Sequence, residues 1–314
     1  MGKISFTAMQ TYLSKTISSL NRNKLNGIMA EIEFRDYLNK IGFIDRISPG
    51  GWIVRSVGEG RFGHHTQVFF PETIKADNDY SLANSTQPPK ALHTICATMH
   101  QIGIKSYYCY PIVKEGAAQL YVEWYSTQLG IPGESPYKKL SESCENFSKR
   151  SRSYNFLRYN TDATIIPLSS LPDQFTKENL RVSFATDFMA EISDIDGVFW
   201  GQQYTYPIEI KEKTPAPDKR IGPYFGLDVG PFVKLAFYAA KKGNLHSLFI
   251  VKEINNVEDR ELVQWWFITF DTLAQYASWV AQGGGTNMGG GNSTVVKIPK
   301  SEFLPLTKEN MDKL

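Results

Sequence analysis

Apolar and polar positions along the chain change their spacing several times, and each change indicates a different element. Between 25 and 41 the apolar residues recur at helical spacing, which predicts an amphipathic helix that ends at Gly42. Two stretches rich in β-branched and aromatic residues, 52–57 and 66–71, predict strands separated by a glycine-rich turn. The start of the chain therefore combines one helix with a pair of strands.

Residues 72–180 follow a less regular pattern. Polar loops precede a predicted helix at 89–101 and predicted strands at 105–113 and 118–125. The Pro172–Asp173 pair is surrounded by Ser, Leu and Gln, and this composition predicts a turn. We therefore expect a mixed α+β segment that differs in character from the rest of the chain.

The most regular pattern lies between 181 and 281. It predicts strand, strand, helix, strand, strand and helix in that order, which is typical of a mixed α/β sheet. The predicted strands are 191–200, 204–213, 245–254 and 264–270, and the predicted helices are 230–244, ended by Gly243, and 271–281. The glycine-rich stretch 283–292 is expected to be a linker, because it lacks the GK[ST] sequence of a phosphate-binding loop.

Composition narrows the class of protein. The chain has 314 residues, of which 42% are apolar and 21% are charged, as in a folded domain. The three cysteines, Cys96, Cys109 and Cys144, have no spacing typical of a disulfide framework or a zinc site, which favours a reducing, cytoplasmic setting. No secretory signal and no apolar run long enough to span a membrane is evident. The net charge of +2 neither requires nor excludes an anionic partner.

Two acidic residues and a lysine in SDIDGVFWGQQYTYPIEIKEK carry the clearest chemistry. Asp196 lies on one predicted strand and Glu209 on the next, and Glu209 is the only acidic residue followed two positions later by lysine. Residues two apart on a strand share a face, so Glu209 and Lys211 point the same way. Converging carboxylates can hold hard divalent cations such as Mg²⁺, and a nearby ammonium can offset charge in a transition state.

A second aspartate nearby means that the sequence does not determine which aspartate binds the metal. Asp194 lies two residues before Asp196 and is expected on the same face, so it can serve as the metal ligand instead. We favour Asp196 over Asp194. Lys234, on the following predicted helix, could approach the phosphate, but we favour a surface lysine whose ammonium extends into solvent.

The residues DIDGV and PIEIK resemble the signature of the PD-(D/E)XK nuclease superfamily, which has the restriction-endonuclease-like fold. The resemblance implies a mixed β-sheet flanked by helices, with Asp196 and Glu209 binding Mg²⁺ and Lys211 positioning the attacking water. It also implies a glutamate on an early helix that reaches the metal site. Glu31 fits that position, and Glu33 is the alternative.

The resemblance divides the chain into three expected parts. Residues 1–71 would be the N-terminal part of the nuclease core, 72–180 a large α+β insertion that recognises DNA, and 181–314 the catalytic core with the C-terminal elements. Basic and aromatic side chains in the insertion and just after the site are candidates for nucleic-acid contact, because such side chains bind phosphates and stack on bases. They are Lys149, Arg150, Arg152, Tyr154, Arg158, Lys213, Lys219 and Arg220.

The expected function is that of a Mg²⁺-dependent endonuclease on double-stranded DNA, most simply a bacterial type II restriction enzyme. Such enzymes commonly act as homodimers that match the symmetry of their sites. No membrane partner and no nucleotide cofactor is expected. The alternatives are a structure-specific repair or defence nuclease acting on DNA or RNA, and a non-catalytic nucleic-acid-binding module on the same fold.

Overall fold

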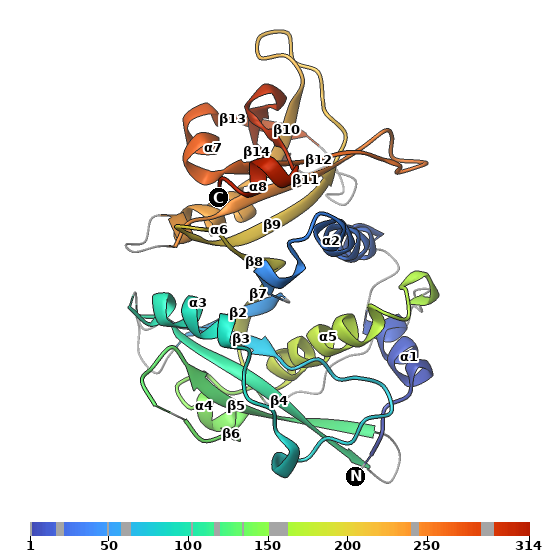
Figure 1. Cartoon of the computed structure of the whole chain (residues 1–314), viewed down its shortest axis with the longest axis vertical. Coiled ribbons are helices and arrows are strands. Elements are labelled where there is room, and N and C mark those ends of the chain that lie inside the picture. Colours follow the sequence, from blue (N-terminus) through green and yellow to red (C-terminus); the bar gives the residue numbers. More distant parts are fainter. Residues whose placement is uncertain are drawn as a thin grey trace. The chain divides into compact units, whose positions relative to one another are not determined.

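The computed structural model in Figure 1 describes most of the chain. The described residues are 2–16, 22–48, 50–57, 64–101, 103–115, 120–133, 135–150, 163–239, 245–283 and 292–314. The chain divides into two compact units, each built from more than one segment. The first unit comprises Met1–Arg22 and Pro49–Ile195, and the second comprises Asn23–Ser48 and Asp196–Leu314.

The described part of the first unit contains a six-stranded sheet of order β6-β5-β4-β3-β2-β7, in which only β3 and β4 pair in parallel. Its strands are β2 (Gly51–Val57), β3 (His64–Pro71), β4 (Lys105–Glu115), β5 (Leu120–Leu129), β6 (Lys138–Lys139) and β7 (Ala190–Ile195). Its helices are α1 (Phe6–Thr16), α3 (Lys90–Gln101), α4 (Leu140–Ser143) and α5 (Leu171–Asp187), with short 3₁₀ turns at Leu82–Asn84 and Ala163–Ile165.

Aromatic side chains fix helix α5 to this sheet. Phe69 on β3 stacks on Tyr107 of β4 and contacts Phe184 of α5 at a ring distance of 4.6 Å. The indole N–H groups of Trp52 and Trp124 donate hydrogen bonds to α5, which satisfies the polar end of each ring. Burial of these large rings gives the first unit a core of its own.

The second unit contains the sheet of order β1-β8-β9-β11-β12-β15 and a three-stranded antiparallel sheet of order β10-β14-β13. Its described strands are β1 (Ile47–Ser48), β8 (Gly197–Trp200), β9 (Thr205–Lys213), β10 (Tyr224–Asp228), β11 (Leu248–Ile254), β12 (Leu262–Thr269), β13 (Ser278–Gly283), β14 (Asn292–Pro299) and β15 (Leu304–Pro305). Its helices are α2 (Arg22–Lys40), α6 (Val229–Ala239), α7 (Phe270–Tyr276) and α8 (Lys308–Met311), with 3₁₀ turns at Ile44–Arg46 and Lys300–Glu302.

Alternation along β11 gives the six-stranded sheet of this unit two apolar faces. Ile250 packs with Ile208 of β9 and with Phe34 of α2 on one face. Val251 packs on the opposite face with residues of α6, α7 and the smaller sheet. Strands β9 and β11 are parallel neighbours joined through α6, as in a β-α-β connection. Strand β9 is therefore central and buried, with helical cover on both sides.

The observed architecture is a mixed α/β protein, as the sequence predicts. The expected helices at 25–41 and 89–101 and the expected strands at 52–57 and 66–71 are present. Among the described helices, none is long and apolar enough to cross a membrane. The three expected segments are combined differently in the compact units, because residues 49–71 belong with 72–195.

Three local predictions are wrong. The stretch 191–200 is two strands instead of one, and they belong to different sheets. Residues 278–281 form part of a strand whose backbone pairs with β14, instead of continuing helix α7. Pro172 and Asp173 lie in the first turn of α5, where proline is tolerated because its missing N–H has no partner in the helix. The expected helix end at Gly243 lies outside the described residues.

Candidate metal and catalytic site

Asp196 is the point at which the chain leaves one sheet and enters another. β7 ends at Ile195 and pairs with β2, whereas β8 begins at Gly197 and pairs with β9. Gly197 lies opposite Ile208, so continuing the antiparallel register by one residue brings Asp196 opposite Glu209. The strand order therefore puts the two carboxylates predicted from the sequence next to each other on neighbouring segments.

The Asp196 side chain is buried, with 6% of its surface exposed. Its Oδ2 accepts a hydrogen bond of 2.6 Å from the backbone N–H of Ile210 on β9. A buried carboxylate is costly unless its charge is compensated, and this bond both stabilises the charge and fixes the orientation of the group. Asp196 is consequently held against β9 with a defined direction.

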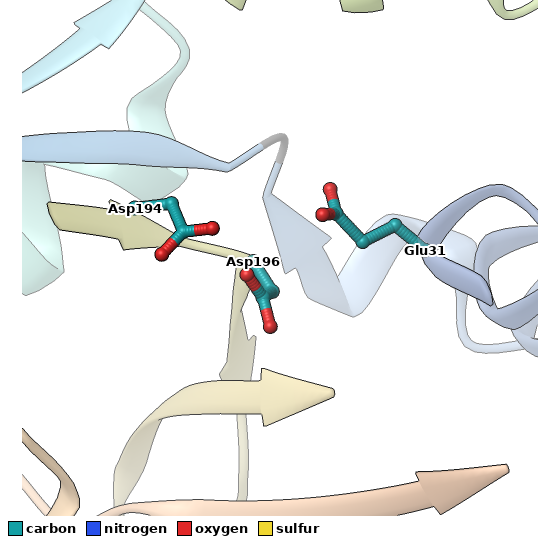
Figure 2. Close-up of side chains that lie close together, drawn as sticks. All are labelled: Glu31, Asp194 and Asp196. Atoms are coloured by element: carbon teal, nitrogen blue, oxygen red, sulfur yellow. The ribbon is translucent and has the colours of Figure 1, made fainter. Parts of the chain in front are cut away.

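Helix α2 brings Glu31 to Asp196. Ala30, Phe34 and Leu38 form a buried stripe along the helix that packs on the sheet beneath it. Glu31 follows Ala30 and lies beside this stripe. Figure 2 shows the Glu31 carboxylate extending from α2 toward the aspartates. One carboxylate oxygen from each of Glu31, Asp194 and Asp196 lies within 4.8 Å of the other two.

Asp194 belongs to the first unit and is joined to Asp196 through Ile195 alone. It is the more exposed of the two aspartates, and it lies opposite Trp52 in the β2–β7 pairing. Glu31 and Asp196 both belong to the second unit, so their closeness follows from the fold of that unit. The alternative first ligand, Asp194, therefore remains compatible with the geometry.

Glu209 is engaged by two ammonium groups. The residue is 2% exposed, its Oε1 lies 2.7 Å from Nζ of Lys211, and its Oε2 pairs with Nζ of Lys234 on α6. Within the described residues, Glu209 is not part of the group formed by the other three carboxylates. The prediction of a solvent-facing Lys234 is wrong, because its side chain is 15% exposed and turns toward the buried carboxylate.

Lys213 lies at the end of the same strand. Burial lowers the pKa of its ammonium, the negative charge of Asp228 opposes that shift, and the positive charge of Lys211 adds to it. A lysine whose charge is disfavoured by its surroundings gains by acquiring an anionic neighbour. Lys219 and Arg220, the other two cations expected to contact nucleic acid in this part of the chain, are exposed on the turn that follows β9.

The donor set is suited to Mg²⁺. All three clustered groups are carboxylates, and hard oxygen ligands are what Mg²⁺ prefers. Oxygens that share one Mg²⁺ lie roughly 3–4 Å apart for bonds of about 2.1 Å, and the oxygens of this group all lie within 4.8 Å of one another. Backbone support for Asp196 resembles the outer contacts that orient metal ligands. The residues therefore fit a divalent cation without a large rearrangement.

Of the predicted nucleic-acid contacts in the first unit, Arg152, Tyr154 and Arg158 lie outside the described residues. Lys149 is exposed and forms an isolated bridge with Phe188, and the backbone N–H of Arg150 donates to Asp187. Lys149 also lines a cavity of about 540 Å³ within the first unit. Two further lysines, Lys105 and Lys138, line that cavity, together with hydroxyl and amide groups and two glutamates.

Sequence reasoning missed a second charged group next to the site. Lys252 on β11 is 3% exposed and pairs with Glu33 of α2 and Glu212 of β9. Of the two glutamates expected on the early helix, Glu33 pairs with Lys252, whereas the Glu31 carboxylate lies near Asp196. A lysine in the otherwise apolar stretch LFIVKEI was the signal, since a charge on a buried strand requires a partner.

No protein-family model, no curated protein and no solved structure matches this chain. Function is therefore inferred from the residues and their geometry.

Proposed function

We propose that the protein is a Mg²⁺-dependent endonuclease that hydrolyses phosphodiester bonds of double-stranded DNA, and that its second unit is a restriction-endonuclease-like core. One observation supports this most strongly. Glu31 and Asp196 are 165 positions apart in sequence, yet they have carboxylate oxygens within 4.8 Å in one unit, beside the strand that carries Glu209 and Lys211. Carboxylates that can hold a divalent cation, with a lysine beside them, are groups that can support metal-dependent phosphodiester hydrolysis.

Glu31 and Asp196 would hold the cation, with Asp194 or Glu209 completing the carboxylate set. When bound, Mg²⁺ supplies Lewis-acid stabilisation of charge on a phosphate and lowers the pKa of water. The hydrogen bond from Ile210 keeps the Asp196 carboxylate oriented before any ligand arrives. Preorganised groups cost no reorganisation during the reaction, which is where enzymes gain most.

Lys211 is the cation best placed to act on the substrate. Its side chain is 36% exposed, whereas that of Lys234 is 15% exposed, although both reach the same glutamate. Lys211 can therefore remain close to Glu209 and still contact a phosphate or orient a water molecule next to it. An ammonium in that position offsets negative charge that develops on the phosphate in the transition state.

We assign recognition of DNA to the first unit. The exposed Lys149 and the polar cavity that it lines provide positive charge and hydrogen-bonding groups there. Phosphate contacts by lysine position a protein on DNA, whereas polar groups can distinguish base edges. Sequence-specific cleavage of duplex DNA as a homodimer, in a bacterial restriction system, is the form of this function that we propose.

The test is cleavage of plasmid DNA by the purified protein with and without Mg²⁺, beside an Asp196→Ala variant. We expect wild type to cut only with Mg²⁺ and the variant to be at least ~10²-fold slower, because a ligand of the cation is lost. Glu309→Gln is the matched control, since Glu309 lies in the same unit and pairs with Lys313 at the surface. Its rate should equal that of wild type.

Discrete fragments from wild type on plasmid and phage DNA would support sequence-specific cleavage. Activity on branched or single-stranded substrates alone would contradict the restriction role and favour a structure-specific nuclease. Binding of DNA without any cleavage would contradict the catalytic role altogether, and would indicate a binding module.

A further inference from the structure

A network of four charged side chains, two of them buried, lies on the α2 side of the sheet in the second unit. Nζ of Lys252 lies 2.6 Å from Oε2 of Glu33 and 3.2 Å from Oε2 of Glu212, and Arg260 pairs with the other oxygen of Glu212. The side chains of Lys252 and Glu212 are only 4% and 7% exposed. The network joins a helix, two parallel strands and the β11–β12 turn through direct ion pairs.

Burial of a lysine side chain in a protein core is unfavourable unless other groups compensate its charge. Removing an ammonium from water costs several kcal/mol, and its partners offset this cost without exceeding it by much, so an apolar residue would stabilise the fold about as well. Lys252 follows Leu248 and Ile250 on the same face of β11, and both of these are fully buried. Lys252 therefore contributes less to the stability of the fold than to determining which charged groups lie next to each other.

The groups that Lys252 brings together are the neighbours of the site residues. Glu212 follows Lys211 on β9, and Glu33 lies two residues after Glu31 on α2. Residues two apart on an α-helix are separated by about 200° around its axis. Glu31 and Glu33 accordingly lie on the two sides of the buried stripe, so the ion pair of Glu33 sets the rotation that aims Glu31.

Helix α2 also contacts the rest of the second unit through its C-terminal half. Tyr37 donates a hydrogen bond of 2.7 Å to the carbonyl of Leu306, and the Phe34 and Tyr37 rings lie against Trp265. These contacts hold the C-terminal half of the helix. The Glu33–Lys252 pair lies only two residues from Glu31, so it fixes the rotation of the helix close to the site.

We propose that Lys252 is a positioning residue for the metal site, which it serves by holding Glu33 and thereby directing Glu31 toward Asp196. This inference rests on the proposed function for the role of Glu31 as a ligand. It predicts that loss of the Lys252–Glu33 pair weakens cation binding while the fold persists. Lys252 itself touches neither the cation nor the substrate.

The test uses the full chain with three variants, Glu33→Gln, Lys252→Met and Lys252→Arg, and Mg²⁺ affinity is measured by titration calorimetry. We expect the first two to raise the dissociation constant about tenfold, as loss of groups that orient metal ligands does. Lys252→Arg should keep an affinity close to that of wild type, because a guanidinium can bridge two carboxylates. Glu309→Gln is the matched control, a glutamate of the same unit that pairs with Lys313 at the surface, and it should bind as wild type does.

Glu33→Gln keeps the test valid if Lys252→Met unfolds, because Glu33 is 40% exposed and tolerates a neutral side chain. Hydrogen exchange of the amides at 24–32 provides a readout without metal, and we expect faster exchange in Glu33→Gln than in the control. Unchanged affinity and unchanged exchange in a folded Glu33→Gln variant would overturn the positioning role. A different result would be that wild type binds no Mg²⁺ although amide exchange at 24–32 is still faster in Glu33→Gln. This would contradict the proposed function, but it would support a structural role of the Glu33–Lys252 pair in holding α2.

Discussion

The two faces of β9 carry the same kind of group in two different settings. On one face Glu209 pairs with Lys211 and Lys234, and on the other Glu212 pairs with Lys252 and Arg260. Each carboxylate is nearly buried and each has two cationic partners. Charge content and burial alone therefore do not distinguish a reactive group from a structural one.

Glu209 and Glu212 differ in the charged groups that lie next to them. Glu209 is opposite Asp196, where the chain passes from one sheet to the other and where Glu31 contributes a further carboxylate. Glu212 lies three residues further along the strand, and the ion pairs of its lysine partner extend to α2. The first setting concentrates negative charge that a cation can compensate, whereas the second is already neutral.

The largest effect should come from neutralising the carboxylate on the site face. Glu209→Gln is expected to lower the rate of Mg²⁺-dependent DNA cleavage by about 10²- to 10³-fold, because Lys211 loses the anion that holds it in place. Steady-state cleavage of a labelled duplex measures this. A variant with the wild-type rate would show that the site face of β9 is structural as well.

Neutralising Glu212, on the face of β9 opposite the site, should lower the stability of the fold more than the rate of DNA cleavage. Glu212→Gln leaves Arg260 without a carboxylate and Lys252 with one, so we expect a loss of about 3 kcal/mol in the free energy of unfolding. Urea denaturation gives the value, and cleavage by the folded variant should remain within about tenfold of wild type. A stability equal to that of wild type would contradict the assignment of this face as structural.

Removing the second cation on the site face should have a smaller effect. Lys234→Met leaves Glu209 paired with Lys211 alone, and we expect about 1–2 kcal/mol of destabilisation in the absence of metal. Added Mg²⁺ should raise the melting temperature of this variant by more than it raises that of wild type, because a cation then replaces the lost ammonium. Lys308→Met, at an exposed position of α8, is the control and should show neither change.

The smallest effect concerns a more accessible ion pair in the same unit. Backbone N–H bonds from Arg220, the Lys297 ammonium and the Ile221 N–H lower the pKa of Asp218 to about 2. A carboxyl whose pKa is lowered on folding adds stability above its unfolded pKa near 3.8, and this stability is lost as the pH falls through about 2. The stability difference between wild type and Asp218→Asn should therefore shrink steadily below pH 4 in thermal melts. A difference that does not change with pH would contradict this.

Strong periodicity made α2 and β9 predictable, together with the pair formed by Glu209 and Lys211. Local sequence could not show that 191–200 divides at Asp196, because both halves are apolar and the division depends on which sheet each half joins. The residues around Pro172 predict a turn where the structure has the start of a helix, because the same residue types open turns and helices.

Partnerships between distant residues were the part that sequence could not supply. Local sequence identifies no partner for Lys234 or Lys252, and only the packing of α6 on β9 and of α2 on β11 gives them glutamate partners. Which of Glu31 and Glu33 faces the aspartates likewise depends on the rotation of α2, which is set by its buried stripe and by Lys252.

The central claim is that the site cleaves DNA with Mg²⁺, and its most direct test is a substitution of Lys211. Because an ammonium cannot be a metal ligand, this substitution separates metal binding from cleavage. Mg²⁺ affinity and cleavage of duplex DNA are measured on Lys211→Ala and wild type in the same buffer. We predict that the variant binds Mg²⁺ within a few-fold of wild type but cuts at least ~10²-fold more slowly. Equal cleavage by the two proteins, or no Mg²⁺-dependent cleavage by wild type on any duplex, would contradict the account.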